Sequence, residues 1–261
     1  MNNIIQSLWI GEEISVIEKL CMASFVANGH EFHLYTYSNL EGVPDGVIIK
    51  DANIILPESQ IFTYCNGSYA GFADWFRWEL LLKCGNFYVD MDMICLKPFD
   101  FQDDIVFGKE DVTLSCPAVI KFPKGHYLSK FMVDVCQYPN KLRGYDGLRT
   151  KIRKLSRKFF LGNRKRNVSW GEAGGPVGFT NVLKYFDLFE SGKPFTYFFP
   201  IHYANWKCIF DDTLKNDPSL FFNTFAIHLW NEKCRQEKGF NKNANFHKDS
   251  LIEQLKRRYL P

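Results

Sequence analysis

One stretch of the chain, residues 72–98, restricts the fold more than any other. Phe72–Cys84 is rich in bulky apolar residues at helical spacing and predicts a helix that Gly85 ends. The apolar run Asn86–Leu96 follows at once and predicts a buried strand, which Pro98 ends. A helix that leads directly into a buried strand favours an α/β fold.

The start of the chain shows the same alternation. We predict a helix over Ser15–Asn28, with Gly29 as its C-cap. The strands that we predict around this helix are Ile4–Ile10, Glu31–Tyr37, Val47–Ile49 and a continuation at Ala52–Ile55. This order fits an α/β domain with a mainly parallel sheet, in which ligands bind beyond the carboxyl ends of the strands.

The second half has fewer clear patterns. The predicted strands are Val112–Ile120 and Pro194–Phe199, the predicted helices are Leu128–Gln137 and Thr180–Phe189, and a further apolar segment is Ala226–Trp230. Hydrophobic residues make up 46 % of the 261 residues, which is enough for a substantial core. We therefore interpret residues 1–261 as a single domain.

The cysteines and the N-terminus bear on the cellular compartment. The 8 cysteines are spread along the chain without a CxxC pair, so we interpret them as reduced core residues rather than zinc ligands or disulfides. Glu12 and Glu13 interrupt the first apolar stretch, which does not resemble a signal peptide. We expect a cytoplasmic protein, with any membrane contact peripheral and on the inner face of the cytoplasmic membrane.

The predicted strand Asn86–Leu96 contains two acidic residues, Asp90 and Asp92. Positions i and i+2 share one face of a strand, so we expect both carboxylates to project together. Two adjacent carboxylates repel each other and are costly to bury, and a divalent cation removes that cost. Oxygen ligands favour Mg²⁺ or Mn²⁺, so the pair predicts such a site. The alternative is a strand end at which both aspartates face water.

A second charged pair lies on the preceding predicted helix. Asp74 and Arg77 are three residues apart and share a helix face. A surface ion pair is one interpretation, but the helix is rich in bulky apolar residues, which favours a functional site. Asp74 would accept hydrogen bonds from ligand hydroxyls, while Arg77 would hold Asp74 or reach a phosphate.

Residues 141–166 are strongly basic. They contain eleven Lys and Arg residues and one acid, a local net charge of +10 in a chain whose total is +3. Apolar residues recur among these cations at roughly helical intervals, at Leu148, Ile152, Leu155, Phe159 and Phe160. We predict that the segment is an inserted basic helix or a mobile loop. Its cations would face solvent only, contact nucleic acid or contact an anionic membrane. We favour the membrane and expect no nucleic-acid partner.

The segment Ala73–Asp92 resembles the "aDxxRyxxLyxyGGxYxDxD" block of glycosyltransferase family 32. Three other matches follow the family's order: Gln6, Trp9 and Gly11 with "IPKIIHQxWxG", Ala173–Pro176 with "tGP", and Ile227–Trp230 with "HxW". The opening Pro is missing, and Ile5 replaces a His. The second glycine of the block is Asn86 here, and Asn enters the left-handed region more easily than most residues.

This resemblance implies a GT-A fold, in which helices flank a Rossmann-like mixed sheet, and metal-dependent hexosyl transfer with retention. It implies a nucleotide-sugar donor, which we expect to be a UDP-linked hexose or N-acetylhexosamine, and a saccharide or lipid-linked saccharide acceptor. The expected cytoplasmic location without a membrane anchor favours a role in bacterial surface polysaccharide or lipopolysaccharide synthesis. The implied metal ligands are Asp90, Asp92 and His228, and the implied catalytic residues are Asp74, Arg77, Asp90 and Asp92. The implied donor contacts are Gln6, Trp9, Asp74, Arg77, Gly174, Gly175, Pro176 and Trp230.

Other interpretations stay open at this point. His228 would otherwise be a core histidine bonded to backbone. A metal-dependent phosphohydrolase also uses Asp-x-Asp, but it needs Thr or a similar residue two positions after the second Asp, where this chain has Ile94. A non-catalytic protein that binds glycans or an anionic surface is a third possibility, and it would not hydrolyse a nucleotide sugar.

Overall fold

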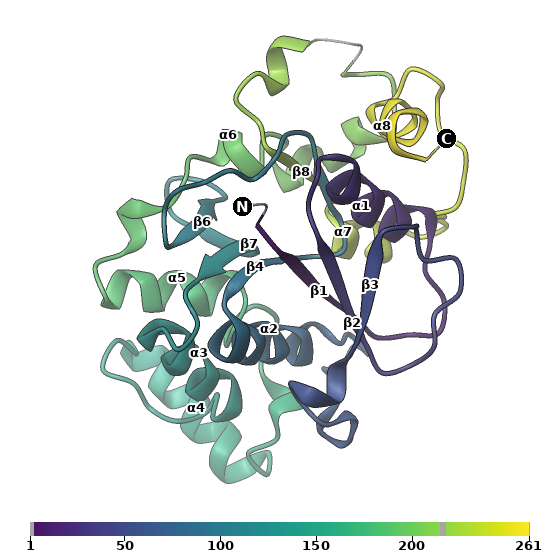
Figure 1. The fold of residues 1–261 in the computed structure, drawn as a ribbon. Helices are drawn as coiled ribbons and strands as arrows, with labels where there is room; N and C mark the ends of the chain where they lie inside the picture. The colour runs from purple at the N-terminus through teal and green to yellow at the C-terminus, as the bar shows by residue number, and fades with distance from the viewer. Residues whose placement is uncertain (1–2, 215–217, 261) are drawn as a thin grey trace. The chain divides into compact units, whose positions relative to one another are not determined.

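The computed structural model describes residues 3–214 and 218–260 (Figure 1). The chain folds as two compact units. Unit 1 comprises Met1–Asp51, Phe87–Gln102 and Lys193–Pro261, and unit 2 comprises Ala52–Asn86 and Asp103–Gly192.

Unit 1 is built on parallel strands. They are β1 (Ile5–Trp9), β2 (Phe32–Thr36), β3 (Val47–Asp51) and β4 (Asn86–Val89), in the order β3-β2-β1-β4. β1 pairs in parallel with both β2 and β4, and β2 pairs in parallel with β3 (Figure 1). The predicted parallel sheet is therefore confirmed, and its strand ends can position ligand-binding residues.

Local signals place the first helix, α1 (Val16–Ala27). Ser15 caps it, because its hydroxyl accepts the N–H of Ile17 and its own N–H donates to the Glu18 carboxylate over 2.8 Å. Gly29 follows the C-cap with φ +83°, a left-handed conformation that glycine adopts without strain. This helix lies within one residue of its predicted ends.

The remaining elements of unit 1 include a short antiparallel pair, β5 (Met93–Cys95) with β8 (Ala226–His228). The helices are α6 (Phe195–Phe198), α7 (Asn231–Gln236), α8 (Leu251–Tyr259) and the 3-10 helices at Tyr203–Ile209 and Pro218–Phe221. The predicted strand at Pro194–Phe199 is wrong. A single helical turn forms instead, closed by the bond from the Phe199 N–H to the Phe195 carbonyl over 2.7 Å, and it buries Phe198.

Unit 2 contains an antiparallel strand pair and four longer helices. The pair is β6 (Val106–Lys109) with β7 (Ser115–Phe122). The helices are α2 (Ala70–Cys84), α3 (Tyr127–Gln137), α4 (Leu148–Phe160), α5 (Pro176–Tyr185) and short 3-10 turns at Ala52–Ile54, Glu58–Gln60, Lys165–Asn167 and Phe189–Ser191. The predicted strand continuation at Ala52–Ile55 is thus wrong.

Two other predicted elements of unit 2 have different bounds in the structure. The strand predicted from Val112 begins at Ser115, because the Asp111 carboxylate accepts the Thr113 and Leu114 N–H groups and holds a turn there. The helix predicted at Thr180–Phe189 is α5, which begins earlier, at Pro176. Proline fits the first turn of a helix, where no N–H is needed.

α2 is a largely buried helix of unit 2. Phe72, Phe76 and Trp78 have no exposed surface. Gly85 ends the helix with φ +71°, and a Cβ there would lie 2.6 Å from the Lys124 nitrogen. Asn86 follows with φ +69°, so asparagine does adopt the left-handed conformation at the family's second glycine.

Parallel and antiparallel strand pairs both occur and helices flank them, so the predicted α/β class with a mixed sheet is confirmed. All eight cysteines are free thiols. Five of them are buried, as predicted, whereas Cys65 is exposed. Within residues 3–214 and 218–260, none of the helices combines the length and the apolar character needed to cross a membrane.

Candidate active site

Asp90 and Asp92 lie in a tight turn of unit 1. β4 ends at Val89 and β5 begins at Met93, and the Met93 N–H donates to the Asp90 carbonyl over 3.1 Å. The prediction that one strand carries both aspartates is therefore wrong. β5 pairs with β8 rather than continuing β4, so the chain has to turn between them. The turn still brings one oxygen of each carboxylate within 4.8 Å of the other.

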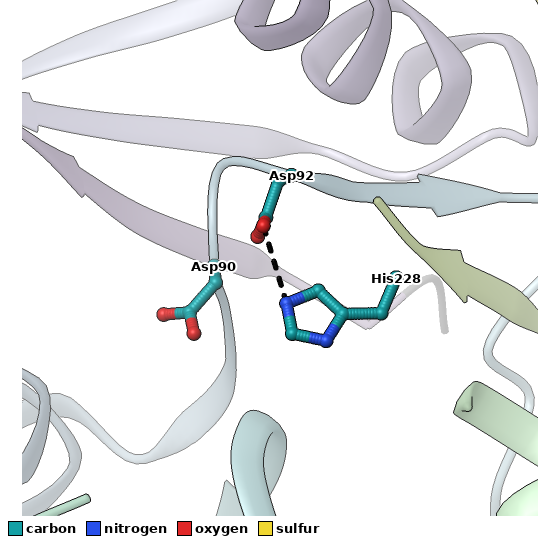
Figure 2. Close-up of side chains that lie close together, drawn as sticks. All are labelled: Asp90, Asp92 and His228. Atoms are coloured by element: carbon teal, nitrogen blue, oxygen red, sulfur yellow. Dashed lines mark ion pairs between the residues drawn. The ribbon is translucent and has the colours of Figure 1, made fainter. Parts of the chain in front are cut away.

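β8 brings His228 to this turn. His228 pairs with Met93 in the β5–β8 ladder, and its ring points toward the two aspartates (Figure 2). One ligand atom from each of Asp90, Asp92 and His228 lies within 4.8 Å of the others. Asp92 and His228 are buried, and Asp90 is half-buried. The structure thus gathers all three of the residues predicted as metal ligands.

The Asp92 carboxylate is held in its ionised form. Burial by itself raises its pKa, but the charge and hydrogen bond of His228 outweigh burial, and the net pKa is lowered. His228 Nε2 lies 3.2 Å from Asp92 Oδ2. The Asn231 N–H donates to the same oxygen over 2.7 Å, and the charge of Lys242 contributes in the same direction.

Trp230 sets the geometry of this last hydrogen bond. It has φ 57° and ψ 50°, a left-handed conformation that is rare for a bulky residue. Its indole N–H donates to the Ile201 carbonyl over 2.8 Å, which anchors the strained residue. The chain therefore bends after β8, and α7 begins with the Asn231 N–H aimed at Asp92.

Asn231 is a site residue that the sequence analysis missed. Its side-chain Oδ1 is buried and has no hydrogen-bond partner among the residues that the structure describes. A buried amide oxygen without a partner is rare and requires an explanation. The signal in the sequence was a polar residue directly after the "HxW" match.

The ligand atoms fit a divalent cation. Carboxylate oxygens suit Mg²⁺ and Mn²⁺, while imidazole suits transition metals, so the mixed set favours Mn²⁺. Imidazole binds metal through a nitrogen that carries no proton, so a proton on His228 Nε2 and a metal ion at this nitrogen exclude each other. The cluster can thus exchange a proton for a metal ion.

Two predicted donor contacts, Gln6 and Trp9, also lie in unit 1. Gln6 is buried, and its amide donates to the Phe87 carbonyl over 3.4 Å, which ties β1 to β4. Trp9 is half-buried at the carboxyl end of β1. Asp90 follows the carboxyl end of the neighbouring strand β4, so Trp9 and Asp90 occupy the edge at which parallel sheets bind ligands.

The other predicted site residues are gathered in unit 2. Arg77 Nη1 donates to Asp74 Oδ1 over 2.9 Å, and the two residues are only 4 % and 7 % exposed. The surface ion pair considered above is therefore excluded. A Cβ added to Gly175 would lie 2.9 Å from Asp74 Oδ2, so the loop Gly174–Pro176 packs directly on this pair. Trp78 Nε1 holds the loop through the Gly174 carbonyl at 3.1 Å.

Known proteins with similar sequences are glycosyltransferases. A family model described as "Alpha 1,4-glycosyltransferase conserved region" matches residues 170–261. Lactosylceramide 4-alpha-galactosyltransferase of Gorilla gorilla gorilla is 27 % identical over 211 residues, covering 72 % of this chain and 58 % of that protein. The Homo sapiens protein of that name is 26 % identical, covering 72 % of this chain and 53 % of its own length. The comparisons support a glycosyltransferase of the family 32 type.

This chain spans between half and two thirds of the length of these two relatives. The matched region 170–261 includes Gly174–Pro176, His228 and Asn231, whereas Asp90 and Asp92 lie outside it. Among solved structures, PaToxG Glycosyltransferase aligns with a TM-score of 0.47 and 18 % identity, covering 71 % of this chain and 69 % of that chain.

Proposed function

We propose that this protein is a metal-dependent, retaining glycosyltransferase with a single domain of the GT-A type, and that Mn²⁺ or Mg²⁺ binds Asp90, Asp92 and His228. The observation that carries the proposal is the clustering of these three side chains within 4.8 Å, directly after a parallel strand. The sequence similarity to galactosyltransferases supports sugar transfer as the reaction.

The donor is a UDP-linked hexose or N-acetylhexosamine, and galactose is the first candidate because the relatives are named as galactosyltransferases. The acceptor is a saccharide, and we favour a lipid-linked one, since the relatives are named for lactosylceramide. A role at the cytoplasmic face of the membrane, in surface polysaccharide or lipopolysaccharide assembly, is part of the same proposal.

The bound cation would neutralise the charge that grows on the departing diphosphate. The Asn231 N–H orients Asp92. The unpartnered Asn231 Oδ1 would accept a hydrogen bond from a bound water or from a hydroxyl of the donor. Trp9 stacks on the nucleobase. Trp230 acts on the donor indirectly, because its backbone conformation places Asn231.

Asp74 accepts hydrogen bonds from donor sugar hydroxyls, and Arg77 is a positioning residue that orients the Asp74 carboxylate. Gly174, Gly175 and Pro176 bring backbone close to the sugar that Asp74 binds, since a Cβ at either glycine would lie within 3 Å of Asp74 and the loop therefore packs directly against this acid. Transfer with retention then follows a front-face displacement, in which a leaving phosphate oxygen takes the acceptor proton. No enzyme carboxylate forms a covalent adduct in this scheme.

A donor panel tests the function. The protein is mixed with UDP-galactose, UDP-glucose, UDP-N-acetylglucosamine or a GDP-sugar, with Mn²⁺ or with chelator, and thermal stability and slow donor hydrolysis are followed. One donor should raise the melting temperature only when metal is present, because a ligand of the native state stabilises it by mass action. It should also be hydrolysed with retained anomeric configuration.

The variant Asp92→Asn should lose both responses, while Glu58→Gln, which removes an exposed acid of unit 2, should keep them. If no donor binds or is hydrolysed with metal, a non-catalytic binding protein is the better interpretation. Turnover that chelator leaves unchanged would contradict the metal site itself. Hydrolysis of simple phosphate esters without sugar preference would favour the phosphohydrolase.

A further inference from the structure

Helix α4, in the basic segment 141–166, has its apolar side turned outward. Its exposed fractions are 74 % at Leu148, 59 % at Ile152, 70 % at Phe159 and 83 % at Phe160. A surface helix of a soluble domain normally turns its apolar side inward. The outward stripe Leu148, Ile152, Leu155 and Phe159, which we call the α4 apolar face, is therefore not part of the core of unit 2.

The inward side of α4 is charged instead. Lys154 and Arg157 are only 6 % and 4 % exposed. Lys154 Nζ lies 2.8 Å from the Asp146 carboxylate, and the Arg157 guanidinium binds the Glu172 carboxylate, with Nη1 to Oε2 at 2.9 Å. Burial raises the pKa of Glu172, but the bond and charge of Arg157 outweigh burial and lower it, so the pair is ionised. Ion pairs thus hold the helix in this orientation.

The α4 apolar face is bordered by cations on both sides. At about 100° per residue, Arg149 lies on one side of the stripe, and Lys151 and Lys158 lie on the other. All three are exposed, and none has a carboxylate partner within the described residues. This surface therefore joins exposed apolar side chains to positive charges that no carboxylate neutralises, a combination typical of an interaction site.

We propose that α4 lies flat in the surface of an anionic lipid bilayer, with the α4 apolar face among the acyl chains and Arg149, Lys151 and Lys158 on the headgroups. The 13 residues of the helix are about 20 Å long, too short to span a bilayer but suited to lie in its plane. The cations on both borders favour anionic lipid over a second copy of this basic helix, because two such faces would repel each other.

Vesicle flotation tests the bilayer as the occupant. The whole protein is mixed with vesicles of phosphatidylcholine alone or with 30 % phosphatidylglycerol, at low and at 0.5 M salt. We expect binding to the anionic vesicles at low salt that falls at least tenfold with neutral vesicles or high salt. Binding that does not depend on anionic lipid content, or no binding at all, would overturn the proposal.

Two variants locate the contact. Ile152→Ser with Phe159→Ser should weaken binding to anionic vesicles at least tenfold, because their apolar surface no longer enters the bilayer. Lys151→Gln with Lys158→Gln should weaken it by roughly tenfold and reduce its salt dependence. The matched control is Val112→Ser with Phe222→Ser, which removes apolar residues that are 86 % and 77 % exposed outside α4 and should leave binding unchanged.

Two measurements separate the other outcomes. Melting temperature and circular dichroism should be the same for the α4 variants and wild type, because the substituted side chains lie in solvent. Sedimentation velocity without lipid tests a second copy as the occupant. If wild type dimerises, and the Ser variants are monomeric while vesicle binding is absent, the α4 apolar face is a protein interface and the proposal is wrong.

Discussion

In each unit one of the acids predicted as a site residue is buried beside a base, but the bases differ. In unit 2, Asp74 is bound by the guanidinium of Arg77, which stays protonated at every pH that the fold tolerates. In unit 1, Asp92 is paired with the imidazole of His228, and a second carboxylate, Asp90, lies alongside. Because the Arg77 guanidinium keeps its charge, it neutralises the Asp74 carboxylate at every such pH. A titratable base beside two acids can instead lose its proton and bind a metal ion together with them.

The contrast indicates different tasks for the two acids. The cluster of unit 1 is suited to hold an exchangeable cation, whereas the pair of unit 2 is suited to fix a loop against a sugar. Variants that remove one member of each pair should therefore affect different properties of the protein.

The largest effect should come from Asp92→Asn. The amide keeps an oxygen for the Asn231 N–H but removes one ligand charge, so metal-dependent donor hydrolysis should fall about 10³-fold while the fold persists. Initial rates at saturating Mn²⁺ measure this. Activity within threefold of wild type would show that the cluster is not the metal site.

Arg77→Ala should act on stability instead. It leaves the buried Asp74 carboxylate without its guanidinium, so the free energy of unfolding in urea should fall by about 3–5 kcal/mol. The companion variant His228→Ala should lower it by only about 1 kcal/mol, because Asp92 keeps the Asn231 N–H. If the two variants lose the same free energy of unfolding, the Asp74–Arg77 and Asp92–His228 pairs do not differ in their contribution to stability.

Gly175→Ala tests whether the loop of unit 2 depends on close approach to Asp74. The new Cβ would lie 2.7 Å from the Gly171 Cα and 2.9 Å from Asp74 Oδ2. We expect a loss of about 1–3 kcal/mol in the free energy of unfolding. Gly147→Ala is the control, because nothing lies within 4 Å of its added Cβ. A neutral Gly175→Ala variant would mean that the loop can move away from the acid.

The pH dependence of metal binding should be the smallest of these effects. The lowered pKa of Asp92 keeps this carboxylate ionised well below neutral pH, so protons compete with the metal at His228 rather than at Asp92. Mn²⁺ affinity measured by calorimetry should fall about tenfold between pH 7.5 and pH 5.5. In His228→Gln most of this dependence should disappear, and a dependence that persists would exclude His228 as a ligand.

The sequence by itself determined the elements whose signals are local. α1 lies where Ser15 and Gly29 predict its ends, and α2 ends at Gly85, because caps and periodicity act within a few residues. The sequence also predicted the types of ligand at the candidate metal site, since the two aspartates lie in the Asp-x-Asp block and the histidine lies in the "HxW" match.

Only the tertiary structure decided which strands pair and which way a helix faces. Asp90 and Asp92 lie in a turn because β5 pairs with the distant β8, a partner that no local pattern specifies. The period of α4 predicts an apolar stripe, but it does not say that the stripe faces outward. That orientation depends on Asp146 and Glu172, acids outside the helix that pair with its buried cations, and such long-range pairing exists only once the chain has folded.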